Sequence, residues 1–234
     1  MRRFERGIAV AVALIAACNS SSGTPGPGGG DATTLAFQQA DPAGDTLVIA
    51  GFDHTVPALD LTLVRGDFKG DSLILTLAFS GPIQPASANA DNSLNGDIEI
   101  DVDNSASTGD SPLSDLYGAS ANLGVDWTVD LFASTPTSAR LYNNTTGVEG
   151  SVKATFATSS MTIRVAMDSL GIVSGSFGLV GVVGVEERPT DVFPNSGSIA
   201  VQRGASFLMP ATRSMPRVVG GELSGHWQRR VARP

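Results

Sequence analysis

Apolar and polar residues alternate along a series of short stretches that begins near Leu35. A period of two is typical of β-strands with one buried face. Segments rich in Gly, Asn, Ser and Pro separate the stretches, as turns do. The stretches lie at residues 59–64, 72–79, 96–103, 126–133, 151–157, 160–167 and 176–185.

Many short strands at this spacing predict an all-β fold, an antiparallel β-sandwich of the immunoglobulin-like or jelly-roll type. We expect a single such domain at residues 35–203, with one helical turn at 167–172. The alternation places Asp126, Thr128 and Asp130 on the outer face of their strand. The apolar side chains that it directs into the core are Leu73, Leu75, Leu77, Phe79, Ile98, Ile100, Val102, Trp127, Val129 and Leu131.

An acidic row follows from the same alternation, because residues two apart on a strand share a face and lie about 6.6 Å apart. Glu99, Asp101 and Asp103 are therefore predicted to point outward, ahead of Asn104 and a Gly/Ser/Thr turn. Ca²⁺ takes six to eight oxygen ligands at about 2.3–2.6 Å. We expect a calcium site at this turn, completed by Asp126 or Asp130 on a neighbouring strand. A solvated acidic edge without any ion is the alternative.

The turn does not match an EF-hand loop. Ala106 stands where the glycine of that loop belongs, and Pro112 stands where its bidentate Glu belongs.

The charge distribution favours cations as ligands of the predicted domain. Residues 31–203 contain 21 acidic and 7 basic residues, and residues 70–139 contain 10 acidic residues and no Lys or Arg. A field of this sign repels phosphate backbones, so we expect no nucleic-acid partner. Net negative charge also keeps surface proteins soluble, which is the simpler interpretation.

Residues 1–17 have the pattern of a secretory signal, with three arginines ahead of an apolar run too short to span a bilayer. The sequence that ends in Cys18, Ile-Ala-Ala-Cys, resembles the lipobox of bacterial lipoproteins. This resemblance implies that Cys18 carries acyl chains and anchors the protein to a membrane. Asn19 after the cysteine implies the outer membrane. An ordinary signal peptide with a chance cysteine is the alternative.

The two flanks of the domain differ in composition. Residues 18–34 are mostly Ser, Gly, Pro and Thr, which predicts a flexible linker. Residues 204–234 contain five arginines and one acid, and we expect a largely disordered basic tail with at most one segment packed back. The arginines could bind anionic lipid or the acidic domain itself.

Two Gly-Asp-Ser sequences, at 70–72 and 109–111, mimic the nucleophile motif of GDSL-type esterases. That motif needs an α/β fold and a downstream Asp-x-x-His. The only histidines are His54 and His226, and Gly51 and Leu223 precede them by three residues. A hydrolase is therefore a weak alternative.

Sugar binding through stacked aromatic rings has few candidates in the domain. Only Trp127, Tyr117 and Tyr142 could serve, and the strand phase of Trp127 points it into the core. Haem ligation through a histidine would depend on His54 alone, since it is the only histidine of the domain.

The order of the segments resembles β-sandwich modules related to family 9 carbohydrate-binding modules and DOMON domains. The resemblance covers about residues 40–201 and includes DPAGDT at 41–46 and TDVFPNSGSIAV at 190–201. Its most specific residues are Asp101, Asp103, Asn104, Thr108, Gly109, Gly124 and Asp126. It implies the fold, and its functions range over sugar binding, haem binding and no known ligand.

These observations predict a lipid-anchored, non-catalytic β-module of the bacterial cell envelope with a binding or structural role, stabilised by Ca²⁺. A carbohydrate-binding surface lipoprotein is the main alternative. The expected partners are the membrane, through Cys18, and glycans or envelope proteins.

Overall fold

The structure is a computed structural model that describes residues 33–49, 56–172, 175–202, 207–208 and 218–219. Nearly all regular elements are strands, which confirms the predicted all-β, mainly antiparallel fold. The strands are β1 (Thr33–Ala40), β2 (Val48–Ile49), β3 (Leu61–Lys69), β4 (Ser72–Phe79), β5 (Gln84–Pro85), β6 (Ser93–Asp101), β7 (Trp127–Asp130), β8 (Ser138–Asn143), β9 (Glu149–Phe156), β10 (Ser160–Ala166), β11 (Ser176–Val185), β12 (Arg188–Phe193), β13 (Ile199–Gln202), β14 (Phe207–Leu208) and β15 (Val218–Val219). Three short 3₁₀ helices join them: η1 (Ala86–Ala88), η2 (Leu113–Tyr117) and η3 (Asp168–Leu170).

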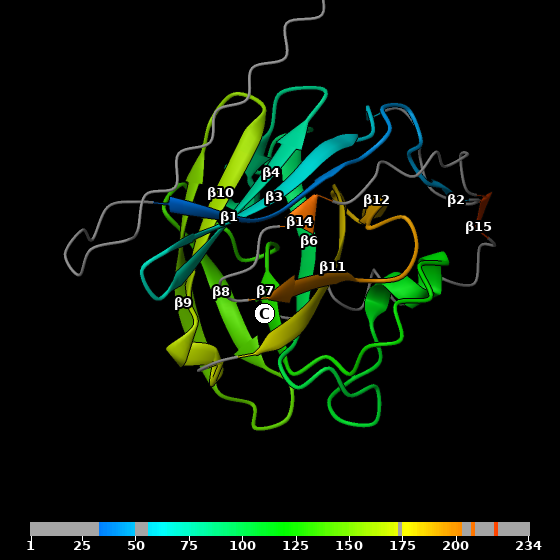
Figure 1. The fold of residues 1–234 in the computed structure, drawn as a ribbon. Helices are drawn as coiled ribbons and strands as arrows, with labels where there is room; N and C mark the ends of the chain where they lie inside the picture. The colour runs from blue at the N-terminus through cyan, green and yellow to red at the C-terminus, as the bar shows by residue number, and fades with distance from the viewer. Residues whose placement is uncertain (1–32, 50–55, 173–174, 203–206, 209–217, 220–234) are drawn as a thin grey trace, which may run out of the picture.

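The main sheet is one continuous hydrogen-bonded path in the order β12-β11-β6-β7-β8-β9-β10-β4-β3-β1-β14. It curls around a common interior (Figure 1). β13 pairs with β11, and β5 pairs with β6. Two separate sandwiched sheets are therefore not confirmed, because hydrogen bonds connect every strand of this path.

The interior of the curl is the main hydrophobic core. Most of the predicted inward residues are fully buried there, including Leu77, Ile98 and Leu131 at 0% exposure. Val102 and Trp127 are half-buried and pack against the same core. The period of two therefore identified the core face of these strands correctly.

A second apolar layer covers the outer face of β6, β11 and β12. It contains η2, which follows the β6 turn (green coil in Figure 1), and packs Leu113 and Tyr117 against Val182 and Val192. Ala121 and Leu123 pack against Val180 in the same way. These strands are thus buried on both faces, which explains why β11 is apolar along nearly its whole length.

The cover corrects one prediction. The expected outward, solvent-facing acidic row is wrong for Glu99 and Asp101, which are 1% and 0% exposed. Thr128 and Asp130 also face outward yet are buried, at 1% and 8% exposure. Alternation shows which face a residue occupies, but the residues that cover this face come from a later, irregular segment.

The ends of the domain differ slightly from the expected boundaries. β1 begins at Thr33, inside the expected linker. Two short strands lie in the expected tail, where β14 pairs in parallel with β1 and β15 with β2. The expected helical turn at 167–172 contains η3. The predicted signal, Cys18, His54 and His226 lie outside the described residues.

Candidate metal centre

Three carboxylates meet where β6 ends and β7 begins. Asp101 is the last residue of β6, and Asp103 follows in the turn. Asp126 comes directly before β7. The backbone amide of Asp126 donates a hydrogen bond to the Ile100 carbonyl (3.0 Å), which extends the pairing of β7 with β6. One carboxylate oxygen from each of the three aspartates lies within 4.8 Å of the other two. Asp101 and Asp103, which are two positions apart, therefore form one cluster with Asp126, which follows Asp101 by 25 positions.

Backbone amides orient the buried carboxylate of Asp101. Its Oδ1 accepts hydrogen bonds from the amides of Asp103 (3.1 Å) and Ser105 (3.3 Å), and its Oδ2 accepts one from the amide of Gly124 (3.1 Å). These bonds compensate for the loss of water around a buried charge.

The other two carboxylates are also oriented by the turn. Asp103 accepts a hydrogen bond from the Ser105 amide (2.9 Å), and the Thr108 hydroxyl lies 3.0 Å from each of its carboxylate oxygens. Asp126 Oδ2 accepts a bond from the Val102 amide (2.9 Å). Hydrogen bonds within the protein thus orient all three carboxylates.

Gly124 allows the turn to approach β7 closely. A Cβ at this position would lie 1.6 Å from the carbonyl oxygen of Thr108 and 2.3 Å from that of Ser105. No side chain fits at these distances. The resemblance included both Gly124 and Asp126, and the two have different roles. Gly124 allows the close approach of the turn, and Asp126 contributes a carboxylate oxygen to the cluster.

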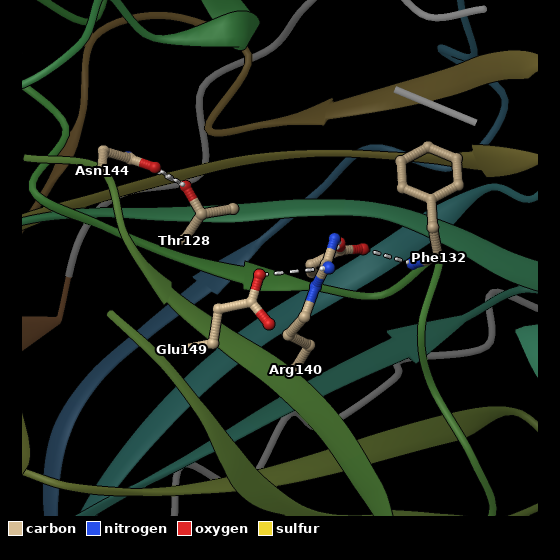
Figure 2. A network of polar contacts seen from close by, with 6 residues as sticks. Thr128, Phe132, Arg140, Asn144 and Glu149 are labelled. Atoms are coloured by element: carbon tan, nitrogen blue, oxygen red, sulfur yellow. Dashed lines mark hydrogen bonds and ion pairs between the residues drawn. The ribbon is translucent and has the colours of Figure 1, made fainter. Parts of the chain in front are cut away.

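Asn144, in the turn after β8, holds the start of β7. Its amide donates to the Asp126 carbonyl (2.8 Å), and its side-chain Nδ2 donates to the Val125 carbonyl (3.1 Å). The same side chain bonds to the Thr128 hydroxyl (Figure 2). This network fixes the backbone that carries the Asp126 carboxylate.

The electrostatics of the cluster favour a cation. Burial raises the pKa of Asp126, and the negative charges of Asp103 and Asp101 raise it further, while the hydrogen bond from Val102 opposes these effects. A cation between the carboxylates would relieve the repulsion.

The geometry fits a hard cation that prefers oxygen. Two oxygens bound to one Ca²⁺ at about 2.3–2.6 Å can be at most about 5 Å apart, and the three aspartates satisfy this limit. The cluster has no His or Cys, which are the ligands typical of zinc sites. Waters or backbone carbonyls would have to complete the coordination shell.

Two residues predicted for this site bind elsewhere. Both carboxylate oxygens of Glu99 accept from the Leu113 amide (2.9 and 3.0 Å), so Glu99 secures the start of η2. The Asn104 side chain donates to the carbonyl (2.5 Å) and hydroxyl (3.2 Å) oxygens of Ser176. Of the acidic residues in the expected set, those that the structure brings together are Asp101, Asp103 and Asp126.

A second acidic cluster was not predicted as a site. Asp41, Asp45 and Asp191 are all buried, with one oxygen of each within 4.8 Å of the others. Asn195 Nδ2 donates to Asp41 (2.6 Å) and Asp45 (2.8 Å). These residues lie in DPAGDT and TDVFPNSG, segments that the resemblance included, so the signal was present but was not interpreted as a cluster.

Burial dominates the electrostatics of this second cluster. It raises the pKa of Asp191 well above its usual range, and the negative charge of Asp41 raises it further. The amides of Leu61 and Val192 each donate to Asp191 at 2.8 Å and act in the opposite direction.

Asp130, another predicted outward acid, belongs to an ion-pair network rather than to a metal cluster. It accepts two hydrogen bonds from Arg140 (2.5 and 3.1 Å) and one from the Phe132 amide (2.8 Å). Arg140 also lies 3.6 Å from Glu149 (Figure 2). The hydrogen bond with Asp130 is the main cause of a raised pKa at Arg140.

The aromatic candidates and Ser72 are buried or half-buried. Tyr117 is a buried residue of the cover itself, where burial and the charge of Asp97 raise its pKa. Trp127 packs against the core, and Tyr142 is half-buried on β8. Ser72 is a buried strand residue that accepts a hydrogen bond from Arg164 (3.1 Å).

Among the described residues, no helix combines the length and the apolar composition that a bilayer-spanning segment needs. A scan against protein-family models gave no match to this chain, and a search of curated proteins gave none either.

Proposed function

We propose that this chain is a lipid-anchored, non-catalytic β-module of the bacterial cell envelope, with a binding or structural role and a Ca²⁺ ion at Asp101, Asp103 and Asp126. The anchor at Cys18 and the outer-membrane location follow from the N-terminal sequence. The observation that supports the ion is the convergence of three carboxylates from two strand ends within 4.8 Å.

The ion would join the β6 turn to the start of β7. This turn continues into η2 and the cover over β6 and β11. Ca²⁺ would therefore stabilise the covered half of the domain, and its role would be to maintain a rigid surface rather than to perform chemistry.

Ca²⁺ should raise the melting temperature of the purified chain relative to the same chain in EDTA. At a free concentration about 100 times the dissociation constant, a ligand of the folded state adds about 2.7 kcal/mol to the free energy of unfolding. For a domain of this size, each kcal/mol corresponds to roughly 2–4 °C.

Asp103→Asn should remove most of this rise, because it deletes one ligand charge in the exposed turn. Asp110→Asn is the matched control, since Asp110 is an exposed acid near the cluster but outside it. A parent protein whose melting temperature does not respond to Ca²⁺ would refute the ion.

A further inference from the structure

A shallow basic groove of about 220 Å³ lies on the outer face of β4, β9 and β10, near the end of β3. Three cations line it although they are far apart in the sequence: Lys69, Lys153 and Arg164. The remaining lining residues are Ile74, Thr155 and Thr162. Among the described residues, no second layer like the one over β11 covers this part of the sheet, and the long side chains of Lys153 and Arg164 are exposed.

The strand register makes the groove continuous. Arg164 on β10 is directly opposite Lys153 on β9 and opposite Ile74 on β4. One pair further along, Thr162 is opposite Thr155 on β9 and Thr76 on β4. A pair of cations therefore lies next to a pair of threonine hydroxyl groups on one face of β9 and β10.

The concentration of positive charge stands out in an acidic protein. Lys69 and Lys153 are the only lysines of the chain. Of the six basic residues in the described part, three line this groove. Outside the groove, Arg65 pairs with Asp67, Arg140 pairs with Asp130, and Arg188 donates to the Val56 carbonyl.

Lys153 and Arg164 oppose each other without an acid between them. Neither makes an ion pair with any described residue, and the hydrogen bond of Arg164 goes to the neutral Ser72 hydroxyl. Like charges directly opposite each other on neighbouring strands are destabilising. A bound anion would remove this repulsion.

We propose that this groove binds an acidic glycan, with a carboxylate between Lys153 and Arg164 and sugar hydroxyls on the threonines. The proposal rests on the proposed binding role but not on the calcium ion. Charge complementarity selects an anion, and the adjacent hydroxyl groups of Thr155 and Thr162 suit a ligand that carries both carboxylates and hydroxyls.

Two other anionic partners fit less well. Bound single-stranded nucleic acid usually stacks its bases on aromatic side chains, and no aromatic residue lines the groove. Stable membrane binding takes a larger apolar contact or a larger cluster of basic residues, whereas Ile74 and three cations line the groove. The volume is below the roughly 300–1,000 Å³ of pockets that enclose a whole ligand, so one acidic unit of a longer chain would occupy it.

Binding of polygalacturonate to the full-length protein in non-ionic detergent tests the proposal, with neutral dextran as the comparison. The buffer contains EDTA, so that calcium bridging contributes nothing and failure here is distinguishable from failure of the ion site. We expect binding of polygalacturonate and none of dextran. Glycerol phosphate, the soluble headgroup of phosphatidylglycerol, and single-stranded DNA form two further arms and should bind more weakly than polygalacturonate.

Lys153→Gln and Arg164→Gln should each weaken polygalacturonate binding about threefold, and the double variant about tenfold, as expected for exposed charge contacts. Arg65→Gln is the control, because Arg65 lies on β3 on the same outer face of the sheet but outside the groove. It also removes one positive charge and should leave the affinity for polygalacturonate within about twofold. Equal binding of dextran, preferred binding of glycerol phosphate or DNA, or a double variant with parental affinity would each overturn the proposal.

Discussion

The outer face of the main sheet is covered by another segment in one region and open to solvent in another. Around β6 and β11, the segment that contains η2 covers the outer face, and charged residues such as Glu99 are excluded from water. On β9 and β10, the outer face is open, and Lys153 and Arg164 extend into solvent. β6, β9 and β10 all have the alternating sequence of a half-buried strand, so alternation alone does not distinguish the covered β6 from the open β9 and β10.

The two regions also differ in what stabilises their charged side chains, which is backbone hydrogen bonding in one and water in the other. In the covered region, carboxylates accept backbone hydrogen bonds, as Glu99 does from Leu113 and Asp101 does from Gly124. In the open region, water can solvate the charges, and two cations stand opposite each other. A substitution in the covered region should therefore cost more than the same substitution in the open region.

The largest contrast is expected between two glycines. Gly124→Ala should lower the free energy of unfolding by about 3 kcal/mol, because its Cβ would overlap the Thr108 and Ser105 carbonyls. Gly150→Ala on β9 should change it by less than about 0.5 kcal/mol, since a Cβ there meets nothing within 4 Å. Urea denaturation measures both, and equal effects would contradict the close approach of the turn.

A smaller contrast is expected between two glutamates. Glu99→Ala should cost about 2 kcal/mol, because it leaves the buried Leu113 amide without its acceptor. Glu149→Ala removes only an exposed partner of Arg140 at 3.6 Å and should cost at most about 0.5 kcal/mol. The same denaturation measurement applies. A Glu99 variant as stable as the Glu149 variant would show that the cover does not depend on this carboxylate.

The smallest effect is a pH dependence from Asp191 in the covered region. Its folded-state pKa is raised, so its buried charge destabilises the fold at high pH, and this penalty is relieved as pH falls through the folded pKa. The melting temperature should therefore rise as the pH is lowered from neutral toward the ordinary range of an aspartate, about 4, by roughly 2–4 °C for each kcal/mol of relieved penalty. Asp191→Asn should flatten the profile, and a variant with the parental slope would exclude Asp191 as its cause.

The sequence was sufficient for the fold class and for the core face. Ile98 and Ile100 are buried as predicted, because the alternation of β6 directly reports which side chains share a face. It was not sufficient for Glu99 and Asp101, which occupy the predicted outer face but lie under a later segment. Nothing within β6 encodes this cover, although the unbroken apolar run of β11 is a signal that both of its faces are buried.

The candidate site was predicted in part for a similar reason. Asp101 and Asp103 are neighbours in sequence, and the antiparallel pairing of β6 with β7 brings in Asp126, so their proximity could be inferred. The cluster of Asp41, Asp45 and Asp191 joins segments about 150 residues apart. Strand pairing over such a separation depends on the complete topology, which the pattern of one sequence does not provide.

Calorimetric titration of the metal-free chain with Ca²⁺ tests the central claim, that Asp101, Asp103 and Asp126 form a cation site, most directly. We predict saturable binding of about one Ca²⁺ per chain, retained in Asp110→Asn and lost in Asp126→Asn. Absence of binding by the parent chain, or unchanged binding by Asp126→Asn, would contradict the claim.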